Sequence, residues 1–442
     1  MKTDFTFSKE AQRAIELVKN PDKNLFITGK AGTGKSTLLE HMRMTADKKM
    51  IVLAPTGVAA INVRGETIHS FFKLKPGFEL DEATNMRIDD KKRKMYGSIK
   101  TILIDEISMV RADLLDAIDI FLRRARMSEE PFAGVQMIFF GDLFQLPPVI
   151  TNVDKRRFYS EYESPYFFSA RVFQSRNLFT EPFRMERIEL DEIYRQTDKE
   201  FIRVLNAVRD NSATEEELDI LNERVDENFV PADDLSCIHL MTTNANAHEI
   251  NMAKLEQISK PEMEFVAKAK GKLTKSLHPN DPMITVKVGA QVMFINNDSK
   301  RRWVNGTLGV VRSCVDRYNE ETDDMETILM VKVHGGELVE VKQHTWEISK
   351  YKFAGGAFVR EQIGSFSQMP LKLAWAITIH KSQGKSFDNV VIDLGWGSFA
   401  HGQTYVALSR CTSLEGLVLK KKLKPSDVIV DECVRQFACG EL

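Results

Sequence analysis

The chain has 442 residues, a length that predicts two to four domains. Its 61 lysines and arginines nearly balance 63 aspartates and glutamates, so net charge excludes no partner, and any nucleic-acid footprint must be a local groove. The five cysteines have no C-x-x-C spacing, which excludes a disulfide scaffold. No apolar run is long enough to span a bilayer, which excludes a membrane-spanning protein. The start, "MKTDFTFSKE", has no apolar targeting segment, so the sequence favours the cytoplasm.

Residues 29–37, "GKAGTGKST", match the pattern G-x-x-x-x-G-K-[ST] of a phosphate-binding loop. Gly32 and Gly34 let the backbone bend so that successive N–H groups point at phosphate oxygens, and a helix starting near Gly34 adds its positive end. Lys35 is expected to reach the β- and γ-phosphates, and the Ser36 hydroxyl to hold Mg²⁺. A chance glycine-rich loop is disfavoured, because the motif lies between an expected strand and an expected helix.

Apolar runs alternate with helical patterns through the first half of the chain. The expected strands are "NLFITG", "MIVLAP", "TILIDE" and "QMIFFGD". Residues 108–126 are expected to form a long helix with one apolar face. That face is made by Leu114, Leu115, Ile118, Phe121 and Leu122. The alternation predicts an α/β fold with a parallel sheet covered on both faces, interrupted by a small charged insertion at 64–98.

The second half resumes the same alternation. "LSCIHLMT", "NVVIDL" and "GLVLKK" are expected strands, and "NANAHEINMAKLEQI" and "TYVALSR" are expected helices. Between them, residues 288–368 contain β-rich runs broken by Gly-Gly, Asn-Gly and Asn-Asp turns. This spacing predicts a small antiparallel barrel inserted into a second α/β lobe.

Two acidic residues and a glutamine follow expected strands of the first half. Asp105 and Glu106 end "TILIDE", a strand expected to lie beside the strand of the phosphate loop. Asp105 can hold the Mg²⁺ shell, while Glu106 can polarise an attacking water. Gln145 in "GDLFQLPP" is a neutral amide able to sense the γ-phosphate, although the GD…PP frame is also typical of an ordinary turn.

Two arginines of the second half are candidate fingers. Arg195 lies in "LDEIYRQTDKEF" and Arg410 in "YVALSRCTS". An arginine that reaches the γ-phosphate stabilises the charge that develops in the transition state. If both residues reach across to the first lobe, ATP would hold two lobes together and hydrolysis would release them. The alternative for each is a surface salt bridge.

Two stretches carry side chains suited to phosphate and sugar contacts. Residues 378–387, "TIHKSQGKSF", contain Thr378, His380 and Lys381, and "APTGVAAINVRGETIHSFF" contains Thr56, Gly57 and His69. Phe71 or Phe72 could stack on a base, but both are interpreted as core residues. His69 has the same alternative, and the run at Lys91–Lys94 is interpreted as a solvated face.

Seven motifs occur in the order found in superfamily-one helicases: "GTGKST", "APTGVAA", "LIDEISM", "GDLFQLPPV", "YRQTD", "TIHKSQG" and "YVALSR". The stretch "EISMVRADLLDAIDIFLRRARMSEEPFAGVQMIFFGD" resembles the signature of the petite-integration-frequency (PIF) family of DNA helicases. The resemblance covers nearly the whole chain and implies an ATP-driven motor that moves 5′ to 3′ on single-stranded DNA.

The resemblance also implies a domain plan and site residues. The plan is two RecA-like lobes, at 1–63 with 99–185 and at 186–287 with 369–442, a wedge insertion at 64–98, and a barrel of the Src-homology-three kind at 288–368. The implied ATP and Mg²⁺ site comprises Gln12, Gly32, Thr33, Gly34, Lys35, Ser36, Thr37, Asp105, Glu106, Gln145, Arg195, Gln383, Gly384 and Arg410. The implied DNA track comprises Thr56, Gly57, His69, Thr243, Asn244, Thr378, His380 and Lys381.

The expected partner is single-stranded, forked or otherwise structured DNA, bound by a monomer that serves DNA replication, repair or telomere maintenance. Two other interpretations stay open at the level of sequence. One is a nucleotide-switched clamp that binds single strands without translocating, and the other is an RNA-directed motor of the same superfamily. Many family members carry long extensions around the motor, whereas this chain has almost none. It is expected to be either a minimal bacterial or phage-like form or a trimmed piece of a longer protein.

Overall fold

The computed structural model describes residues 7–45, 50–75, 77–78, 80–174, 181–196, 198–231, 236–271, 273–320 and 323–440. The first six residues of "MKTDFTFSKE" and the threonine of "YRQTD" lie outside this described part. Contacts divide the chain into two compact units. The first unit comprises Met1–Arg195, Ser349–Ile363 and Asp431–Leu442, and the second comprises Gln196–Ile348 and Gly364–Val430.

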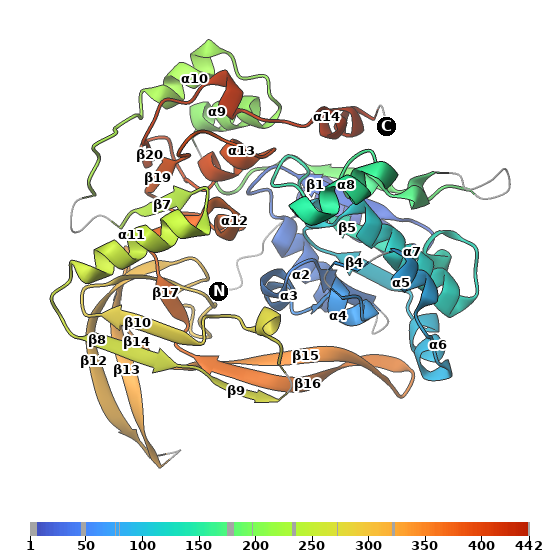
Figure 1. The fold of residues 1–442 in the computed structure, drawn as a ribbon, viewed down its shortest axis with the longest axis horizontal. Helices are drawn as coiled ribbons and strands as arrows, with labels where there is room; N and C mark the ends of the chain where they lie inside the picture. Colours follow the sequence, from blue (N-terminus) through green and yellow to red (C-terminus); the bar gives the residue numbers. More distant parts are fainter. Residues whose placement is uncertain are drawn as a thin grey trace. The chain divides into compact units, whose positions relative to one another are not determined.

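The first unit is built on a six-stranded parallel sheet with the order β3-β2-β4-β5-β1-β6 (Figure 1). Its strands are β1 Leu25–Gly29, β2 Met50–Ala54, β3 Glu66–Thr67, β4 Thr101–Ile104, β5 Gln136–Phe140 and β6 Glu186–Leu190. The four strands expected from apolar runs are confirmed as β1, β2, β4 and β5. The sequence missed β3 and β6, because one has two residues and the other alternates buried with half-buried positions.

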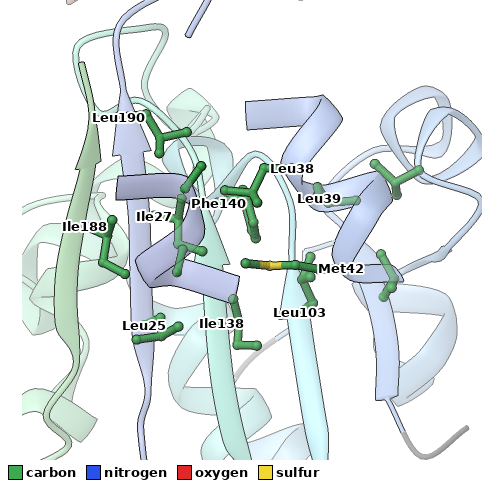
Figure 2. Packing of buried hydrophobic residues seen from close by; sticks show 14 of the residues in the cluster. Leu25, Ile27, Leu38, Leu39, Met42, Leu103, Ile138, Phe140, Ile188 and Leu190 are labelled. Carbon is green, nitrogen blue, oxygen red and sulfur yellow. The ribbon is translucent and has the colours of Figure 1, made fainter. Parts of the chain in front are cut away.

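Both faces of this sheet are covered, as the continuous apolar runs predict. Successive strand residues point to opposite faces, so Leu25 and Ile27 of β1 pack on the side of α2 together with Ile138 and Phe140 of β5 (Figure 2). On the other side, the Phe26 ring lies 5.4 Å from that of Phe167. Each fully buried side chain of this kind contributes roughly 1.5–3 kcal/mol of burial free energy.

Helices and short 3₁₀ turns connect these strands. The α-helices of the first unit are α1 Lys9–Val18, α2 Lys35–Thr45, α3 Gly57–Asn62, α4 Ile68–Phe72, α5 Leu80–Asn85, α6 Asp90–Gly97, α7 Ala112–Arg126, α8 Asn152–Glu161 and α14 Glu432–Cys439. The long helix expected at 108–126 is α7, which begins at Ala112 because Val110 and Arg111 are extended after the 3₁₀ turn Ile107–Met109. Its expected apolar face is buried.

The second unit contains a four-stranded parallel sheet with the order β18-β7-β19-β20 (Figure 1). Its strands are β7 Ile238–Met241, β18 Ala376–Thr378, β19 Val390–Asp393 and β20 Leu417–Leu419. Its helices are α9 Lys199–Arg209, α10 Glu215–Asn222, α11 Asn244–Glu256, α12 Ile379–Ser382 and α13 Gln403–Leu408. The three expected strands and two expected helices are confirmed, whereas the short strand β18 was not predicted.

The β-rich region expected at 288–368 is antiparallel, as predicted, and it begins earlier in the chain. A five-stranded sheet has the order β14-β13-β12-β11-β17, a second sheet has the order β15-β16-β9, and β10 pairs with β8. The strands are β8 Glu262–Val266, β9 Lys268–Gly271, β10 Met283–Lys287, β11 Gln291–Phe294, β12 Leu308–Asn319, β13 Asp324–Val333, β14 Leu338–Val341, β15 His344–Ala354, β16 Ala357–Gln368 and β17 Leu371–Leu373. Closure into a barrel stays a prediction.

The tip of the β15–β16 hairpin, Ser349–Ile363, belongs to the first unit. The Tyr351 N–H donates to Glu66 Oε2 at 2.9 Å, and the Val52 N–H donates to the Tyr351 hydroxyl at 3.2 Å. The Tyr351 and Phe71 rings lie 6.0 Å apart at their centroids. A residue nearly 300 positions away in sequence therefore hydrogen-bonds to β2 and to Glu66 of the edge strand β3.

The last described helix, α14, also belongs to the first unit. Its Phe437 ring stacks on Phe168 with centroids 4.3 Å apart, and the Tyr166 hydroxyl donates to Asp431. The sequence-based domain boundaries stay a prediction, and the compact units differ from them at the hairpin tip, at this helix and at residues 186–195.

Candidate active site

The phosphate-binding loop joins β1 to α2 in the first unit. Gly32 and Gly34 adopt φ angles of 86° and 81°, which side-chain-bearing residues rarely adopt. The Lys35 Nζ donates to the carbonyl oxygens of Gly29 at 2.6 Å and Lys30 at 2.9 Å. The buried Thr33 donates its hydroxyl to the Lys30 oxygen at 2.9 Å. The loop therefore fixes its lysine, and Ser36 and Thr37 open the helix whose N-terminus faces the loop.

Arg195 lies beside this loop. The Tyr194 N–H donates to the Gly32 oxygen at 2.9 Å, and a Cβ added at Gly32 would lie only 2.5 Å from the Arg195 Cβ. Gly32 is therefore required both by its backbone angle and by the close approach of Arg195. The sequence assigned Arg195 to the second lobe, whereas its contacts put it in the first unit.

Asp105 and Glu106 follow β4. One expectation is wrong here: β4 is not the neighbour of β1, because β5 lies between them in the sheet. Burial, reinforced by the charge of Glu106, raises the pKa of Asp105 to about 7, and the charge of Lys35 opposes this shift. Glu106 has a φ of 51°, an unusual backbone conformation of the kind found at functional sites.

Gln145 follows β5, the strand between those that carry the phosphate loop and the acidic pair. Its side-chain Nε2 donates to Asp142 Oδ2 at 3.1 Å, and the Phe144 N–H donates to Asp142 Oδ1 at 3.2 Å. Asp142 is buried, and sequence reasoning gave it no role. The GD…PP stretch could have indicated this role for Asp142, because a buried carboxylate three residues before an amide side chain can orient that amide.

The oxygen donors in this region suit Mg²⁺. Ser36 supplies a hydroxyl and Asp105 a carboxylate, whose raised pKa reflects buried negative charge that a cation would offset. The described residues contain no group of three or more His, Cys, Asp or Glu side chains that could bind a metal by themselves. Mg²⁺ is usually bound through one or two protein carboxylates, with water and substrate phosphate oxygens as its other ligands.

Arg410, Gln383 and Gly384 lie in the second unit. Arg410 is buried, and its guanidinium donates to the oxygens of Val406 at 2.9 Å and Lys385 at 3.1 Å. Gly384, with a φ of 75°, lies next to Lys385. The described contacts thus join the "YVALSR" and "TIHKSQG" motifs into one cluster inside this unit.

Two lysines that the sequence did not single out adjoin this cluster. Burial lowers the pKa of Lys385 to about 8, and the charges of Lys372 and Arg410 add to this effect. Burial likewise lowers the pKa of Lys372 to about 8, with a further contribution from the charge of Lys381. A group of cations that repel one another in a partly buried place favours an anion such as phosphate.

Three threonines of the predicted DNA track share one structural role. Thr56, Thr243 and Thr378 are the N-cap residues of α3, α11 and α12, helices that start just after β2, β7 and β18. Each hydroxyl oxygen accepts a backbone N–H of its own helix, at 3.2, 3.2 and 3.3 Å. Gly57 and Asn244 are the first residues of their helices. Within each unit the caps therefore lie at the carboxyl edge of the parallel sheet.

The remaining predicted site residues are partly exposed or lie in the core. Burial lowers the pKa values of His69 and His380, and Lys381 is exposed next to His380. The exposed Gln12 donates its Nε2 to the Phe7 oxygen at 2.8 Å. Phe71 and Phe72 are buried against Tyr96, so their interpretation as core residues is confirmed.

The first unit carries a phosphate-binding loop on a parallel sheet, with an acidic pair and a glutamine on neighbouring strands, and the second unit has a parallel sheet of its own. These features define a P-loop nucleoside triphosphatase of the RecA-like, two-lobed class. The model of the PIF1-like helicase family matches residues 7–219. An ATP-dependent DNA helicase Pif1 of Bdellovibrio bacteriovorus is 34% identical, over 98% of this chain and 92% of that protein. The chain belongs to the PIF1-like helicase family, as its motifs predict.

Other relatives agree with this assignment. An ATP-dependent DNA helicase PIF1 of Danio rerio is 36% identical over 93% of this chain, which spans 60% of that relative. Unliganded Pif1 from Bacteroides sp. has a TM-score of 0.86 at 37% identity, with 99% of this chain and 97% of that one covered. Bacteroides Pif1 bound to single-stranded DNA has a TM-score of 0.67 at the same identity and coverage. None of the helices in the described ranges has the length and apolar character that a bilayer crossing requires.

Proposed function

We propose that the chain is an ATP-dependent DNA helicase that moves 5′ to 3′ along single-stranded DNA and unwinds forked or otherwise structured DNA. The observation that carries this proposal is the phosphate-binding loop with Lys35, the acidic pair, Gln145 and Arg195 on one parallel sheet of a PIF1-like chain. Relatives named ATP-dependent DNA helicase support it. So do a Bacteroides Pif1 structure in complex with ADP-AlF4 and a Pif1 structure that addresses DNA unwinding at forked duplex DNA.

Each nucleotide-site residue has a proposed role. Lys35 neutralises the β- and γ-phosphates, and Ser36 and Asp105 would hold Mg²⁺, which supplies charge neutralisation to the phosphates when bound. Glu106 polarises the attacking water, while Gln145 responds to the γ-phosphate. Arg195 and Arg410 stabilise charge on the transferred phosphoryl group. Gln12, Thr33, Thr37, Gln383 and Gly384 complete the nucleotide contacts.

The DNA track is proposed to follow the capped helix ends. Thr56, Gly57 and His69 would contact the strand on the first lobe, and the second lobe would add Thr243, Asn244, Thr378, His380 and Lys381. Contacts of this kind favour the sugar–phosphate backbone over base edges, so binding should be strongly salt-dependent and show little sequence preference. The insertion at 64–98 is proposed to be the wedge, and 288–368 a barrel. We also propose a cytoplasmic location, in line with the bacterial relatives.

The test uses two duplexes of identical sequence, one with a 5′ single-stranded tail and one with a 3′ tail. ATP-dependent unwinding of the 5′-tailed duplex alone is expected. The reverse preference would contradict the direction and leave the helicase assignment standing. ATP hydrolysis that DNA stimulates without any unwinding would favour the clamp, and preference for matched RNA tails would favour the RNA-directed motor.

A further inference from the structure

The inserted helices α5 and α6 are attached to the first unit through the last turn of α7. Helix α7 ends in Arg123, Arg124 and Arg126. Arg124 and Arg126 donate to backbone oxygens outside α7. The acceptors of Arg124 lie in the insertion, and those of Arg126 lie at its end and at Ile99, the residue directly after it. The other, Arg123, is buried, pairs with Asp119 and donates to the Glu129 oxygen, toward β5.

Arg124 caps the carboxyl end of α5. Its Nη1 donates to the oxygens of Ala83 at 2.8 Å and Met86 at 2.9 Å. The last carbonyl groups of a helix have no partner within that helix, and they carry the negative end of its dipole. A guanidinium that satisfies two such oxygens at once makes charge-assisted bonds, which are stronger than neutral ones.

Arg126 does the same for α6. Its Nη1 lies 2.8 Å from the Ile99 oxygen, 3.2 Å from that of Gly97 and 3.4 Å from that of Tyr96. The carboxyl ends of α5 and α6 thus both lie at the final turn of α7, and one arginine of α7 donates to each end.

An aromatic contact reinforces the same attachment. Tyr96 of α6 is 1% exposed, and its hydroxyl donates to the Phe71 oxygen at 2.8 Å. The Tyr96 ring lies 4.7 Å from the Phe121 ring of α7. The base of the insertion is therefore packed and hydrogen-bonded to α7, whereas Asp81, Glu82 and Arg87 are exposed.

Helix α7 begins close to the nucleotide site. Glu106 leads into the 3₁₀ turn Ile107–Met109, and α7 starts at Ala112. A Cβ added at Gly141, just before Asp142, would lie 2.8 Å from a methyl carbon of Ile107. One nearly fully buried helix, about 22 Å long at 1.5 Å per residue, therefore runs from the acidic pair to the insertion.

We propose that Arg124 and Arg126 are positioning residues for strand separation, which hold α5 and α6 rigidly on α7 so that the insertion can act on the duplex junction. The proposal rests on the proposed helicase function and on the role of the insertion as the wedge. A wedge loosely held at its base yields under load, so ATP hydrolysis continues while fewer base pairs open. DNA binding and ATP hydrolysis need neither arginine directly.

Arg124→Gln is the sharpest variant, because both of its acceptors lie inside the insertion. Arg87→Gln is the matched control, since it removes the same charge from an exposed position of the insertion. Both full-length proteins are assayed for unwinding of a 5′-tailed duplex and for ATPase stimulated by oligo-dT. We expect Arg124→Gln to lower the unwinding rate about tenfold, with ATPase within about twofold of wild type, and Arg87→Gln to lower the unwinding rate far less than Arg124→Gln does.

Three further readouts distinguish positioning from a general structural role. The deficit of Arg124→Gln should grow when the duplex is richer in G·C pairs, because each step then carries a larger load. Arg124→Lys keeps the charge and should restore part of the rate. Amide hydrogens of residues 80–97 should exchange faster in Arg124→Gln than in Arg87→Gln.

If the wild-type protein hydrolyses ATP but opens no duplex, the proposed function itself is contradicted. With unwinding by wild type established, equal unwinding by Arg124→Gln and Arg87→Gln would overturn the positioning proposal. Parallel loss of ATPase and unwinding in both Arg124→Gln and Arg126→Gln would also overturn it, because the arginines would then support the whole lobe. Unchanged amide exchange in the insertion would count against it in the same way.

Discussion

The two α/β units hold their proposed nucleotide-site residues by different physical means. In the first unit they follow strand ends on unusual backbone, with positive φ angles at Gly32, Gly34 and Glu106. In the second unit Arg410 is buried and bonded to backbone oxygens. Helix-capping threonines occur in both units, Thr56 in the first and Thr243 and Thr378 in the second. The first arrangement fixes the backbone of the loop that is proposed to hold the phosphates. The second holds cations and helix ends in place by many local hydrogen bonds, so no single one of those bonds defines it.

The largest expected effect tests the cradle of the first unit. Lys35→Ala should lower ATPase turnover about a thousandfold, because it removes the ammonium group proposed to neutralise the β- and γ-phosphates directly. Affinity for labelled single-stranded DNA should change little, since the proposed DNA contacts lie elsewhere. Steady-state hydrolysis and fluorescence anisotropy measure the two quantities. Wild-type turnover in Lys35→Ala would show that the loop is not the nucleotide site.

The two arginines compare the units directly. Arg195→Ala and Arg410→Ala should each lower kcat about a hundredfold with little change in KM for ATP, because finger contacts strengthen in the transition state. The Arg410 variant should in addition lower the thermal unfolding midpoint, since its guanidinium satisfies buried oxygens. A variant with normal kcat would assign that arginine a purely structural role.

A smaller effect is expected at Asp142, which orients Gln145 in the first unit. Asp142→Asn offers an amide in place of the carboxylate, so the Gln145 side chain can turn over and present the wrong atom to the nucleotide. We expect kcat to fall about tenfold, with the fold intact. Asp142→Asn and Gln145→Ala should not be additive when combined. If the losses of kcat were additive, Asp142 and Gln145 would act independently of each other.

The smallest effect concerns stability of the second unit alone. Burial, together with the charges of Lys420 and Lys254, lowers the pKa of His239 to about 4. In the unfolded chain a histidine titrates near 6.5, so between these values the unfolded state binds more protons. This contribution to the free energy of unfolding is fully present above about pH 6.5 and is lost as the pH falls toward about 4. By pH 5 the loss amounts to about 1–2 kcal/mol.

His239→Gln should remove this part of the pH dependence. Urea unfolding of wild type and variant at pH 7.5 and pH 5 measures the difference, and ATPase at pH 7.5 should be unchanged. If the variant loses as much stability as wild type between the two pH values, His239 is not buried as a neutral group.

The sequence by itself determined the strands that are continuous apolar runs, the amphipathic helix α7 and the phosphate-binding loop. These features depend on local periodicity and on glycine angles, which a short stretch of chain encodes. The order of the motifs was enough to predict the family.

Tertiary structure alone decided which strands are neighbours. The order β4-β5-β1 contradicts the expected adjacency of β4 and β1, because the connections between parallel strands can cross over intervening ones. Tertiary structure also decided that Arg195 lies against Gly32, that Tyr351 bonds to Glu66 and that Arg124 caps α5. Such contacts join residues far apart in sequence through single hydrogen bonds or close approaches of backbone. They produce no periodicity, so only the folded chain shows them.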